Sequence, residues 1–562
     1  MHCPRPPPLW NGWRARPCDP YWPVWTPMNR RRFWRRSQRG RTRCIPRAPR
    51  GCCSPSGACF LSLRARTAAD QPGIIRGVVA EGATMIGRVR RIIGVVLCGC
   101  LAGPGAALQA ADGDRPPLVI EHVDVISMVQ GAPPVLRDQT VVIAGGRIQA
   151  VEASASPTPV KGAQRIDGRG RYLLPGLVDM HVHVWDEAEL PAYLAHGVTT
   201  VRNASGMPFL LEFADAIQAG RLTGPELITT GPILNGRGHN TQANHQIVET
   251  AAEAREAVFA HHARGYRHLK VYSNLNPEAY RAIRLAAREL GMSIMGHTPE
   301  GARQVDAAGV PSFEIAFRDI LRDGWLSIEH VESIVWHALG DRLDPQAMCA
   351  LAAEIAASGV PVTPTLLAHH NLVRVARSQG AFLRRPGVET MNPFIAQLEQ
   401  PVYQHWASQP PTSRDAHDAF YAEAARCLHE QGVTLLAGSD AGIFVNIPGL
   451  SLLEELELLR GGVGISPWEV LATATRNPAQ VLGRAARAGQ IAPGFDADIL
   501  LLAGNPLEDI GALRQLEGLV VDGVWRDAQG IEALHRQARE VSLERSQQRI
   551  LAAMAAQGTP VE

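Results

Sequence analysis

Lysine and cysteine are both scarce in this chain of 562 residues. Only two of its 56 lysine and arginine residues are lysines, Lys161 and Lys270, and beyond residue 100 the only cysteines are Cys349 and Cys427. Two cysteines over so long a stretch do not make a disulfide framework, so we expect one bridge or none. The body of the chain must be stabilised by a hydrophobic core, which a 46% hydrophobic composition permits.

Acidic residues are also scarce at the start of the chain, where arginine and tryptophan are abundant. No hydrophobic period is sustained over residues 1–84, which predicts disorder. A basic arm that carries tryptophan could bind nucleic acid or an anionic membrane. We favour the interpretation that residues 1–84 are a misassigned upstream extension, that the chain starts at Met85, and that nucleic acid is not a partner.

The apolar run from Ile92 to Leu101 is too short to cross a bilayer as a helix, so it predicts no transmembrane span. It follows several arginines and precedes small residues, an arrangement typical of a secretory signal peptide over residues 85–111. We therefore expect a periplasmic or secreted protein. The stretch Leu97–Cys100 also resembles a lipobox, which leaves open a lipid anchor at Cys100.

Short strands flank the middle of the chain on both sides. Apolar and polar residues alternate over residues 118–151, and a similar set of strands returns over residues 498–525. We expect residues 112–174 and 486–530 to form one small β-sandwich-like sheet domain, followed by a C-terminal helix or tail over residues 531–562.

Residues 175–485 repeat a pattern of strand followed by helix. Helix signals include a start at Pro277 with a stop at Gly291, and a start at Pro345 with a stop at Gly359. Eight such repeats predict an α/β fold, a (β/α)8 TIM barrel inserted in the sheet domain, whose active site lies at the C-terminal ends of the strands. The predicted strands are Leu173–His183, Val198–Asn203, Glu226–Leu234, His268–Tyr272, Ser293–His297, Ser327–His330, Pro361–Leu367 and Thr434–Asp440.

Residues that bind metal ions fall at the ends of several of these strands. His181 and His183 are two positions apart, so they point to the same side of a strand. Taken alone, such a pair is more often two solvated histidines. Four later strands, however, also carry such a residue at or near the same end, which favours one metal centre. The candidate ligands are His181, His183, Lys270, His297, His330 and Asp440.

Lys270 stands on a buried apolar strand in a chain that otherwise uses arginine for nearly every positive charge. A buried lysine can lose its proton, whereas an arginine cannot. A neutral amine can add carbon dioxide, and the two oxygens of the resulting N6-carboxylysine can bridge two cations. We expect two divalent metal ions, with His181, His183 and Asp440 on one and His297 and His330 on the other. Zinc suits these ligands best, although manganese and cobalt are also accepted at such sites.

A hydroxide that bridges the two ions is the expected nucleophile, because metal binding lowers the pKa of water from ~16 to ~7. Asp440 would take its proton and pass it to the leaving group, first as general base and then as general acid.

Over residues 118–527 the chain resembles the amidohydrolase superfamily, and more narrowly its imidazolonepropionase-like and Xaa-Pro dipeptidase-like branch. The matching stretches are Leu174–His183, Lys270–Tyr272, Gly296-His297, Glu329-His330, Ala437–Gly442 and residues 489–499. The resemblance implies the same metal roles and hydrolysis of an amide or similar bond. It also implies that His239, in the matching position after the third strand, contacts the substrate and takes part in catalysis.

Two further residues are candidate contacts for a small-molecule substrate. Tyr272 lies two positions beyond Lys270 on the same side of the strand and could bind substrate or merely pack. Arg237 could hold a substrate carboxylate through its planar guanidinium. The proline-rich segment 368–411 is expected to cap the site. Whether the chain forms a homo-oligomer is left open.

The leading hypothesis is an exported binuclear metal-dependent amidohydrolase that cleaves a peptide-like bond, in a dipeptide or an N-acyl amino acid. A lactone, a phosphoester or a cyclic amide such as imidazolonepropionate is the alternative substrate on the same metals. Deaminases of the superfamily usually lack the carboxylated lysine, so Lys270 counts against them. A non-catalytic barrel scaffold is the third hypothesis, and the complete set of ligands argues against it.

Overall fold

The computed structural model describes residues 115–557 apart from residues 239, 240, 243 and 308. The extension 1–84, the signal peptide 85–111, the lipobox cysteine Cys100 and the loop residue His239 all lie outside the described residues.

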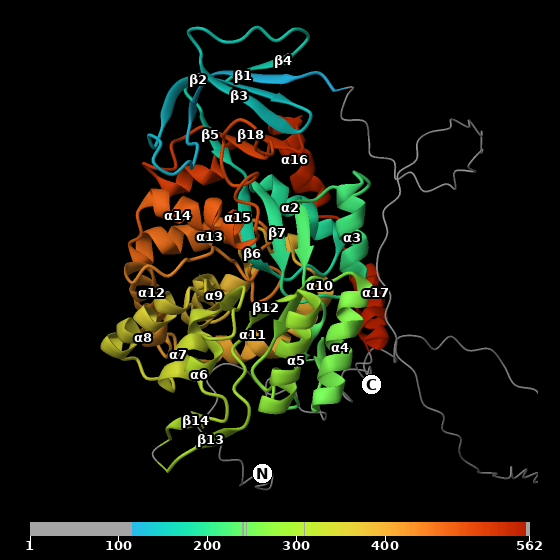
Figure 1. Cartoon of the computed structure of the whole chain (residues 1–562), viewed down its shortest axis with the longest axis vertical. Helices are drawn as coiled ribbons and strands as arrows, with labels where there is room; N and C mark the ends of the chain where they lie inside the picture. The colour runs from blue at the N-terminus through green and yellow to red at the C-terminus, as the bar shows by residue number, and fades with distance from the viewer. Residues whose placement is uncertain (1–114, 239–240, 243, 308, 558–562) are drawn as a thin grey trace, which may run out of the picture. The chain divides into compact units, whose positions relative to one another are not determined.

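One eight-stranded sheet combines strands from both ends of the chain (Figure 1). Its order is β19-β18-β17-β5-β1-β2-β3, with β4 paired to β1, and β5 and β17 join the two chain ends through the antiparallel pair Leu174 and Leu500. Apolar residues that alternate along these strands, such as Ile120 and Val520, are fully buried. The strands are β1 Leu118–Val125, β2 Leu136–Ala144, β3 Arg147–Ala153, β4 Gln164–Asp167, β5 Tyr172–Pro175, β17 Ile499–Leu502, β18 Leu516–Val521 and β19 Val524–Arg526.

The middle of the chain forms a TIM-barrel-like α/β domain of parallel strands. A three-stranded sheet has the order β6-β7-β8, and a six-stranded sheet has the order β10-β9-β11-β12-β15-β16. An isolated parallel bridge between Thr230 and His268 links the two sheets on one side. The strands are β6 Leu177–Val182, β7 Val198–Asn203, β8 Glu226–Thr229, β9 Ile233–Asn235, β10 His245–Ile247, β11 His268–Val271, β12 Ser293–Gly296, β15 Ser327–Glu329 and β16 Val362–Thr363.

Residues 434–441 lie between β16 and β6. The amide of Leu436 donates to the carbonyl of Val362 at 2.9 Å, and the amide of Met180 donates to Ala437 at 2.9 Å. This stretch, predicted as the eighth strand, therefore lies in the expected place, although it pairs through isolated bridges and forms no regular strand.

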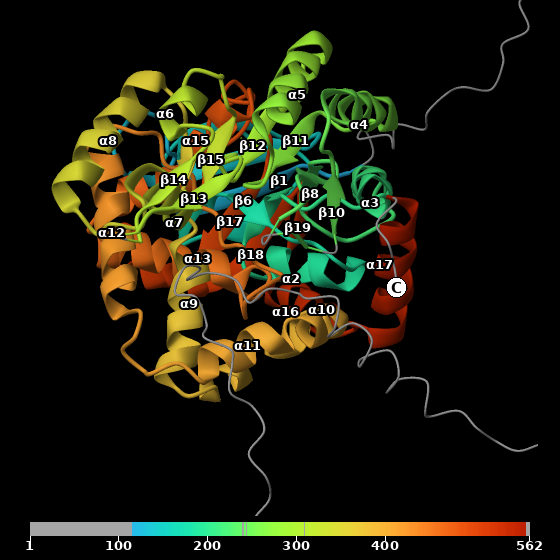
Figure 2. The ribbon, with the colours of Figure 1, turned by 90° about the horizontal axis from the view of Figure 1, so that it is seen from below.

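Helices surround these strands, as seen in Figure 2, where α3, α4, α5, α8 and α12 lie outside β6, β11, β12 and β15. The predicted helix starts and stops are confirmed: Asn276 and Asp344 cap α5 and α8, and each ends at a glycine with positive φ. The helices are α2 Leu190–Ala195, α3 Phe209–Gln218, α4 Ala251–Arg264, α5 Pro277–Leu290, α6 Phe317–Ile320, α7 Val331–Leu339, α8 Pro345–Ser358, α12 Asp415–Glu430, α13 Leu450–Leu458, α14 Pro467–Thr473 and α15 Arg476–Val481.

The seventh predicted strand, Pro361–Leu367, is wrong beyond Thr363, because helix α9 begins at Leu366. Thr365 has a φ of 47°, which turns the chain out of the strand. The buried carboxylate of Glu455 then accepts the amide protons of Leu366 at 3.0 Å and Leu367 at 2.8 Å. The segment after this turn forms helices α9 Leu366–Arg377, α10 Pro393–Leu398 and α11 Gln400–Ala407.

The stretch expected to form a C-terminal helix or tail contains two helices, α16 Ala528–Gln537 and α17 Leu543–Ala556. Helix α17 is held at Asp186, which follows His181 and His183 closely in the chain. Arg545 Nη2 donates to Asp186 at 2.7 Å, and the Ser546 hydroxyl donates to the same carboxylate at 2.9 Å.

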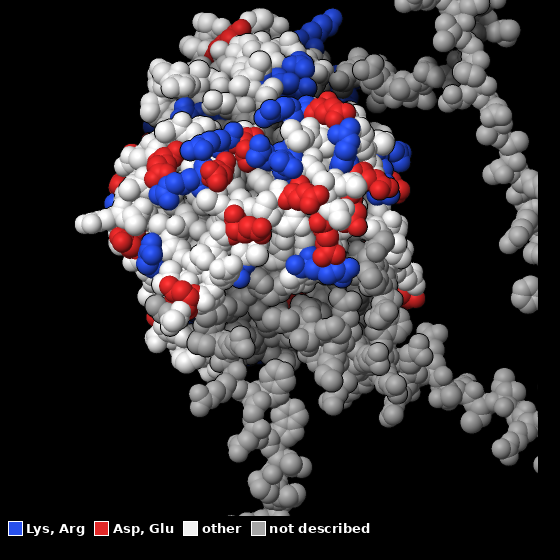
Figure 3. Space-filling model, turned by 60° about the horizontal axis from the view of Figure 1, so that its bottom comes forward, with Lys and Arg blue, Asp and Glu red and all other residues white. Residues whose placement is uncertain are grey.

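On the face shown in Figure 3, basic and acidic side chains are interspersed. Many of the charged residues are paired, such as Arg255 with Glu289 and Arg318 with Glu354. Within the described part of the chain, no helix has the length and apolar character needed to cross a membrane.

A disulfide joins Cys349 on α8 to Cys427 on α12, so of the two expected outcomes, one bridge or none, the structure shows one bridge. It closes a loop over a sequence separation of 78 residues.

Because such a cross-link restricts the unfolded chain, replacing both cysteines by serine should lower the free energy of unfolding by about 2–4 kcal/mol. Denaturant titration of oxidised protein measures the difference. Equal stability of the variant and the parent, both without reductant, would contradict it.

Candidate metal centre

Three of the predicted ligands meet at the ends of β6 and of residues 434–440. His183 Nε2 lies 2.9 Å from Asp440 Oδ1, and His181 Nε2 lies 3.5 Å from the same oxygen. The potential ligand atoms of the three residues are all within 4.8 Å of one another, and all three side chains are buried. Burial alone would raise the pKa of Asp440, but the hydrogen bond from His183 holds it below its usual value. This carboxylate therefore stays ionised, as a metal ligand must.

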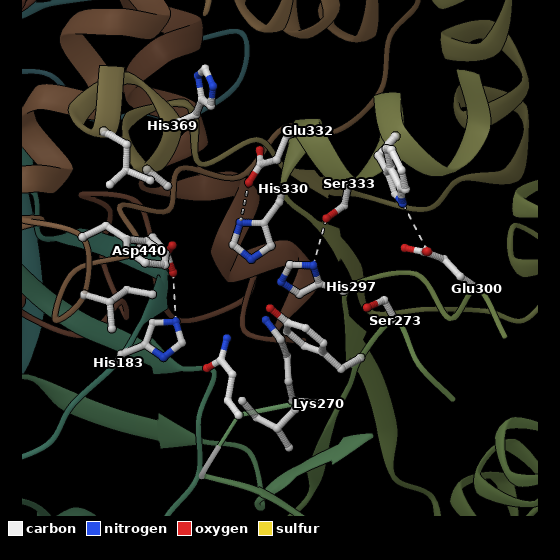
Figure 4. Close-up of a pocket in the computed structure, with 18 of the residues that line it drawn as sticks. His183, Lys270, Ser273, His297, Glu300, His330, Glu332, Ser333, His369 and Asp440 are labelled. Carbon is white, nitrogen blue, oxygen red and sulfur yellow. Dashed lines mark hydrogen bonds and ion pairs between the residues drawn. The ribbon is translucent and has the colours of Figure 1, made fainter. Parts of the chain in front are cut away.

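Lys270 points into the same space from β11 (Figure 4). Its Nζ lies 3.2 Å from His181 Nε2, and the residue is 1% exposed. Burial lowers the pKa of Lys270 to about 8, against the opposing effect of Glu329 and Asp440. A substantial fraction of this amine is therefore neutral near physiological pH.

His297 and His330 complete the cluster from the ends of β12 and β15 (Figure 4). Their ring centroids are 4.3 Å apart, and the ring of His330 is 4.5 Å from that of His181. Ser333 lies 2.8 Å from His297 Nδ1, and Thr365 lies 2.7 Å from His330 Nδ1. Each Nε2 is thus left to face the cluster, and burial lowers both histidine pKa values well below normal. Neutral imidazoles are the form that binds metals.

Two of the candidate ligands have a backbone conformation that is unusual for residues other than glycine. The φ of His330 is 69° and that of Asp440 is 55°. The neighbour Gly442, with a φ of 100°, lies so close to His183 that a Cβ would be 1.9 Å from its carbonyl oxygen. Strain of this kind is concentrated at functional sites, where the surrounding structure holds it.

Two residues that were not predicted from the sequence orient His181. Glu329 contacts the ring nitrogen that faces away from Asp440, and Arg202 pairs with Glu329. Glu329 Oε2 lies 2.6 Å from His181 Nδ1, and Arg202 donates to Glu329 Oε1 at 2.8 Å. Both charged side chains are fully buried. A carboxylate on the outer nitrogen of a metal-binding histidine fixes its tautomer and orientation. Their signal in the sequence was a charged residue inside an apolar strand.

The cluster opens into a pocket that Tyr272 also lines. The Tyr272 ring packs 4.0 Å from that of His297 and 4.7 Å from that of His245. Burial raises the pKa of the Tyr272 hydroxyl above its ordinary value, so the hydroxyl stays protonated. The other pocket residues are His183, Ile233, Gln242, Lys270, Ser273, His297, Glu300, Arg303, His330, Glu332, Ser333, Trp336, Ala368, His369, Leu372, Trp406, Asp440, Ile443 and Phe444.

Of the other two predicted substrate contacts, Arg237 is not among the described residues that line this pocket. The side chain of Arg237 is 75% exposed and pairs with Glu249 at 3.1 Å. His239 lies outside the described residues. The substrate-binding roles of Arg237, Tyr272 and His239 stay predictions.

The profile of the Amidohydrolase family matches residues 172–527, more than half of the chain. This chain belongs to the Amidohydrolase family. It is accordingly a metal-dependent hydrolase that acts on carbon–nitrogen bonds.

Two curated relatives of this amidohydrolase match over most of their length. Ochratoxinase of Aspergillus niger is 24% identical over 487 residues, which cover 75% of this chain and 88% of the relative. Imidazolonepropionase of Rubrobacter xylanophilus is 25% identical over 394 residues, which cover 65% and 84%.

Solved structures show the same fold. A putative prolidase from Bifidobacterium longum has a TM-score of 0.54 at 24% identity, and the match covers 75% of this chain and 99% of that chain. The bottromycin amidohydrolase has a TM-score of 0.59 at 25% identity and covers 77% and 93%. The predicted membership of the amidohydrolase superfamily is thereby confirmed, and imidazolonepropionase and a putative prolidase are among the proteins that this chain resembles.

The residues at this centre fit a divalent metal ion. His181, His183 and Asp440 supply two imidazoles and one carboxylate, a donor set that zinc accepts. Burial lowers the pKa of His181 well below its ordinary value, so its ring is neutral, and its Nδ1 is engaged by Glu329. The Nε2 of His181 is thus directed at the carboxylate of Asp440.

Glu329→Gln should weaken metal binding by roughly 10–100-fold, because His181 would lose the carboxylate that orients it. Metal titration followed by elemental analysis measures the change, with Glu354→Gln on the surface as the matched control. If this variant does not fold, Arg202→Met/Glu329→Gln removes both buried charges together. Unchanged metal affinity in a folded variant would show that Glu329 does not orient His181.

Proposed function

We propose that this protein is an exported, binuclear metal-dependent amidohydrolase that cleaves a peptide-like bond in a dipeptide or an N-acyl amino acid. In this proposal the strands close into a (β/α)8 barrel inserted in the sheet domain. The observation that carries the proposal is the convergence of four imidazoles, one carboxylate and one amine in a single buried cluster. These six donors are more than the four that a tetrahedral zinc ion binds.

The proposed metal positions follow the direction of each side chain. His181, His183 and Asp440 would hold one ion, while His297 and His330 would hold the other. Lys270 would lie between them as N6-carboxylysine, and its low pKa supports this role because only a neutral amine adds carbon dioxide. The ions, with zinc the best match to the ligands, would supply a Lewis acid for a carbonyl oxygen and a nucleophile at neutral pH.

Asp440 is the proposed proton carrier. Its carboxylate is buried, ionised and within 2.9 Å of His183, at the point where the pocket meets the cluster. It would accept a proton from the attacking water and deliver it to the leaving nitrogen. Tyr272, whose ring packs on His297, would contact the substrate beside the cluster.

Two observations guide the choice of substrate. Solved structures of similar fold include a Xaa-Pro dipeptidase with bound methionine and a putative prolidase, which supports a dipeptide-like substrate. Imidazolonepropionase is 25% identical and supports the alternative of a cyclic amide. Lactones and phosphoesters remain further alternatives, whereas a non-catalytic scaffold would not need the six assembled ligands.

Export to the periplasm or beyond is part of the proposal. The disulfide between Cys349 and Cys427 supports it, since structural disulfides persist mainly in oxidising compartments. A lipid anchor at Cys100 is the alternative to a freely diffusing exported protein.

A hydrolysis screen of the metal-loaded protein tests the proposed function. Dipeptides and N-acyl amino acids should be cleaved, and released amine should be detected by a colorimetric assay. A cyclic amide, lactones and phosphoesters form the comparison panel. Turnover of lactones alone would refute the proposed peptidase activity.

Lys270→Ala should lose bound metal and at least 100-fold of the rate, because no carboxylate would join the two ions. Added short-chain carboxylic acids should restore part of both, while Lys270→Arg should not be rescued. Elemental analysis and initial rates, measured with and without acetate, give the readouts. A Lys270→Ala enzyme with full metal and full activity would remove the proposed bridge.

A further inference from the structure

One wall of the pocket is polar and carries Arg303, the first residue of the hairpin strand β13 Arg303–Val305, which pairs with β14 Pro311–Phe313. The Arg303 side chain is 14% exposed and lines the pocket together with Glu300 and Trp336. The hairpin follows β12 and its ligand His297, so this arginine is placed close after a metal-binding position in the chain.

Arg303 is held in a defined orientation. Its Nε donates to the carboxylate of Glu300, and its guanidinium lies 5.2 Å from the centroid of the Trp336 ring. Trp336 Nε1 donates to the same Glu300 oxygen at 3.2 Å. The backbone of Glu300 is itself fixed, since its amide donates to the carbonyl of Ser273 at 2.8 Å. A guanidinium fixed in this way is suited to bind a planar anion with little loss of side-chain entropy.

A second wall of the pocket is apolar. It consists of Leu372 on α9, Trp406 on α11, and Ile443 and Phe444 in the loop after Asp440. These residues belong to or pack against one hydrophobic cluster beneath the wall. In Figure 4, Glu300 and Ser273 lie on one side of His297 and His330, and His369 and Asp440 lie on the other.

We propose that the substrate lies across the metal cluster, with a carboxylate of the leaving amino acid on Arg303 and an apolar acyl group against Leu372, Trp406 and Phe444. The inference rests on the proposed function, because it assigns the two ends of the scissile amide to the two walls. A carboxylate matches the paired N–H groups of a guanidinium. The substrate class is then an apolar N-acyl or N-aminoacyl amino acid with an unblocked carboxyl group.

The test compares N-benzoylglycine with N-benzoylglycinamide on the metal-loaded enzyme. The parent enzyme should favour the acid, and the ratio of kcat/KM for acid over amide should fall by roughly 10–100-fold in Arg303→Met. Because that variant leaves Glu300 buried without its guanidinium, Glu300→Gln/Arg303→Met provides a second, charge-balanced variant. Release of glycine or glycinamide reports turnover, and bound metal should equal that of the parent.

A matched control uses the exposed arginine–glutamate pair of Arg318 and Glu354. The double variant Arg318→Met/Glu354→Gln removes an equivalent ion pair on the surface and should leave the ratio of acid to amide unchanged.

A second arm tests the apolar wall. Leu372→Ala should reduce the preference for N-benzoylglycine over N-acetylglycine while leaving the ratio of acid to amide as in the parent, because it removes apolar contact area only. Thermal unfolding of each variant verifies that it is folded.

The proposal is overturned if the parent cleaves acid and amide equally, or if both Arg303 variants keep the parent ratio. If no amide is cleaved at all, the proposed function fails, and calorimetric binding of N-benzoylglycine and its amide still decides the inference. Tighter binding of the acid that depends on Arg303 supports it; equal binding of both compounds contradicts it.

Discussion

The buried ion pair between Arg202 and Glu329 is the interaction on which the metal centre depends. Arg202 on β7 donates to the Met180 carbonyl on β6 at 2.6 Å and to Ser327 and Glu329 on β15, each at 2.8 Å. One guanidinium thus joins three strands across the interior. An unpaired buried charge is costly, so the pair is stable only when these strands are in register. Because Arg202 binds Glu329 Oε1, Glu329 Oε2 is available to His181 Nδ1. The orientation of the His181 ring is therefore set when these strands pair.

Three residues at the candidate metal centre keep strained backbone conformations because the surrounding fold holds them in place. His330, Thr365 and Asp440 all have positive φ, and each such conformation costs of the order of 1–3 kcal/mol. Thr365 contacts His330 Nδ1 and also begins the turn into α9, so one strained residue serves both the ligand and the apolar wall. The large core of the domain offsets these costs, and the strain is confined to the ends of strands where the side chains must turn inward.

Most strand positions and the six candidate ligands could be predicted from the sequence because both depend on local pattern. Two predicted strands are wrong in extent: Leu173–His183 is divided between β5 and β6, and Glu226–Leu234 between β8 and β9, with the two parts of each in different sheets. Apolar runs mark parallel strands, and a candidate ligand stands at or near the end of five of the eight runs. Glu329 could not be assigned, since its role requires Arg202, which lies 127 residues away in the chain. The start of α9 was missed for a related reason: Leu366 and Leu367 continue an apolar run, and only the distant carboxylate of Glu455 shows that a helix begins there.

The two buried cations at the candidate metal centre show why lysine stands at one position and arginine at the other. Arg202 and Lys270 are both buried beside the metal centre, and burial lowers the pKa of each. Arginine nevertheless stays charged, because its ordinary pKa is so high, and a permanent charge is what the pair with Glu329 requires. The pKa of Lys270 is lowered to about 8, so part of its amine is neutral near physiological pH and able to react. Exchanging the two residue types would therefore place a guanidinium among the candidate ligands, and Glu329 would pair with an ammonium group that lacks the planar geometry of a guanidinium.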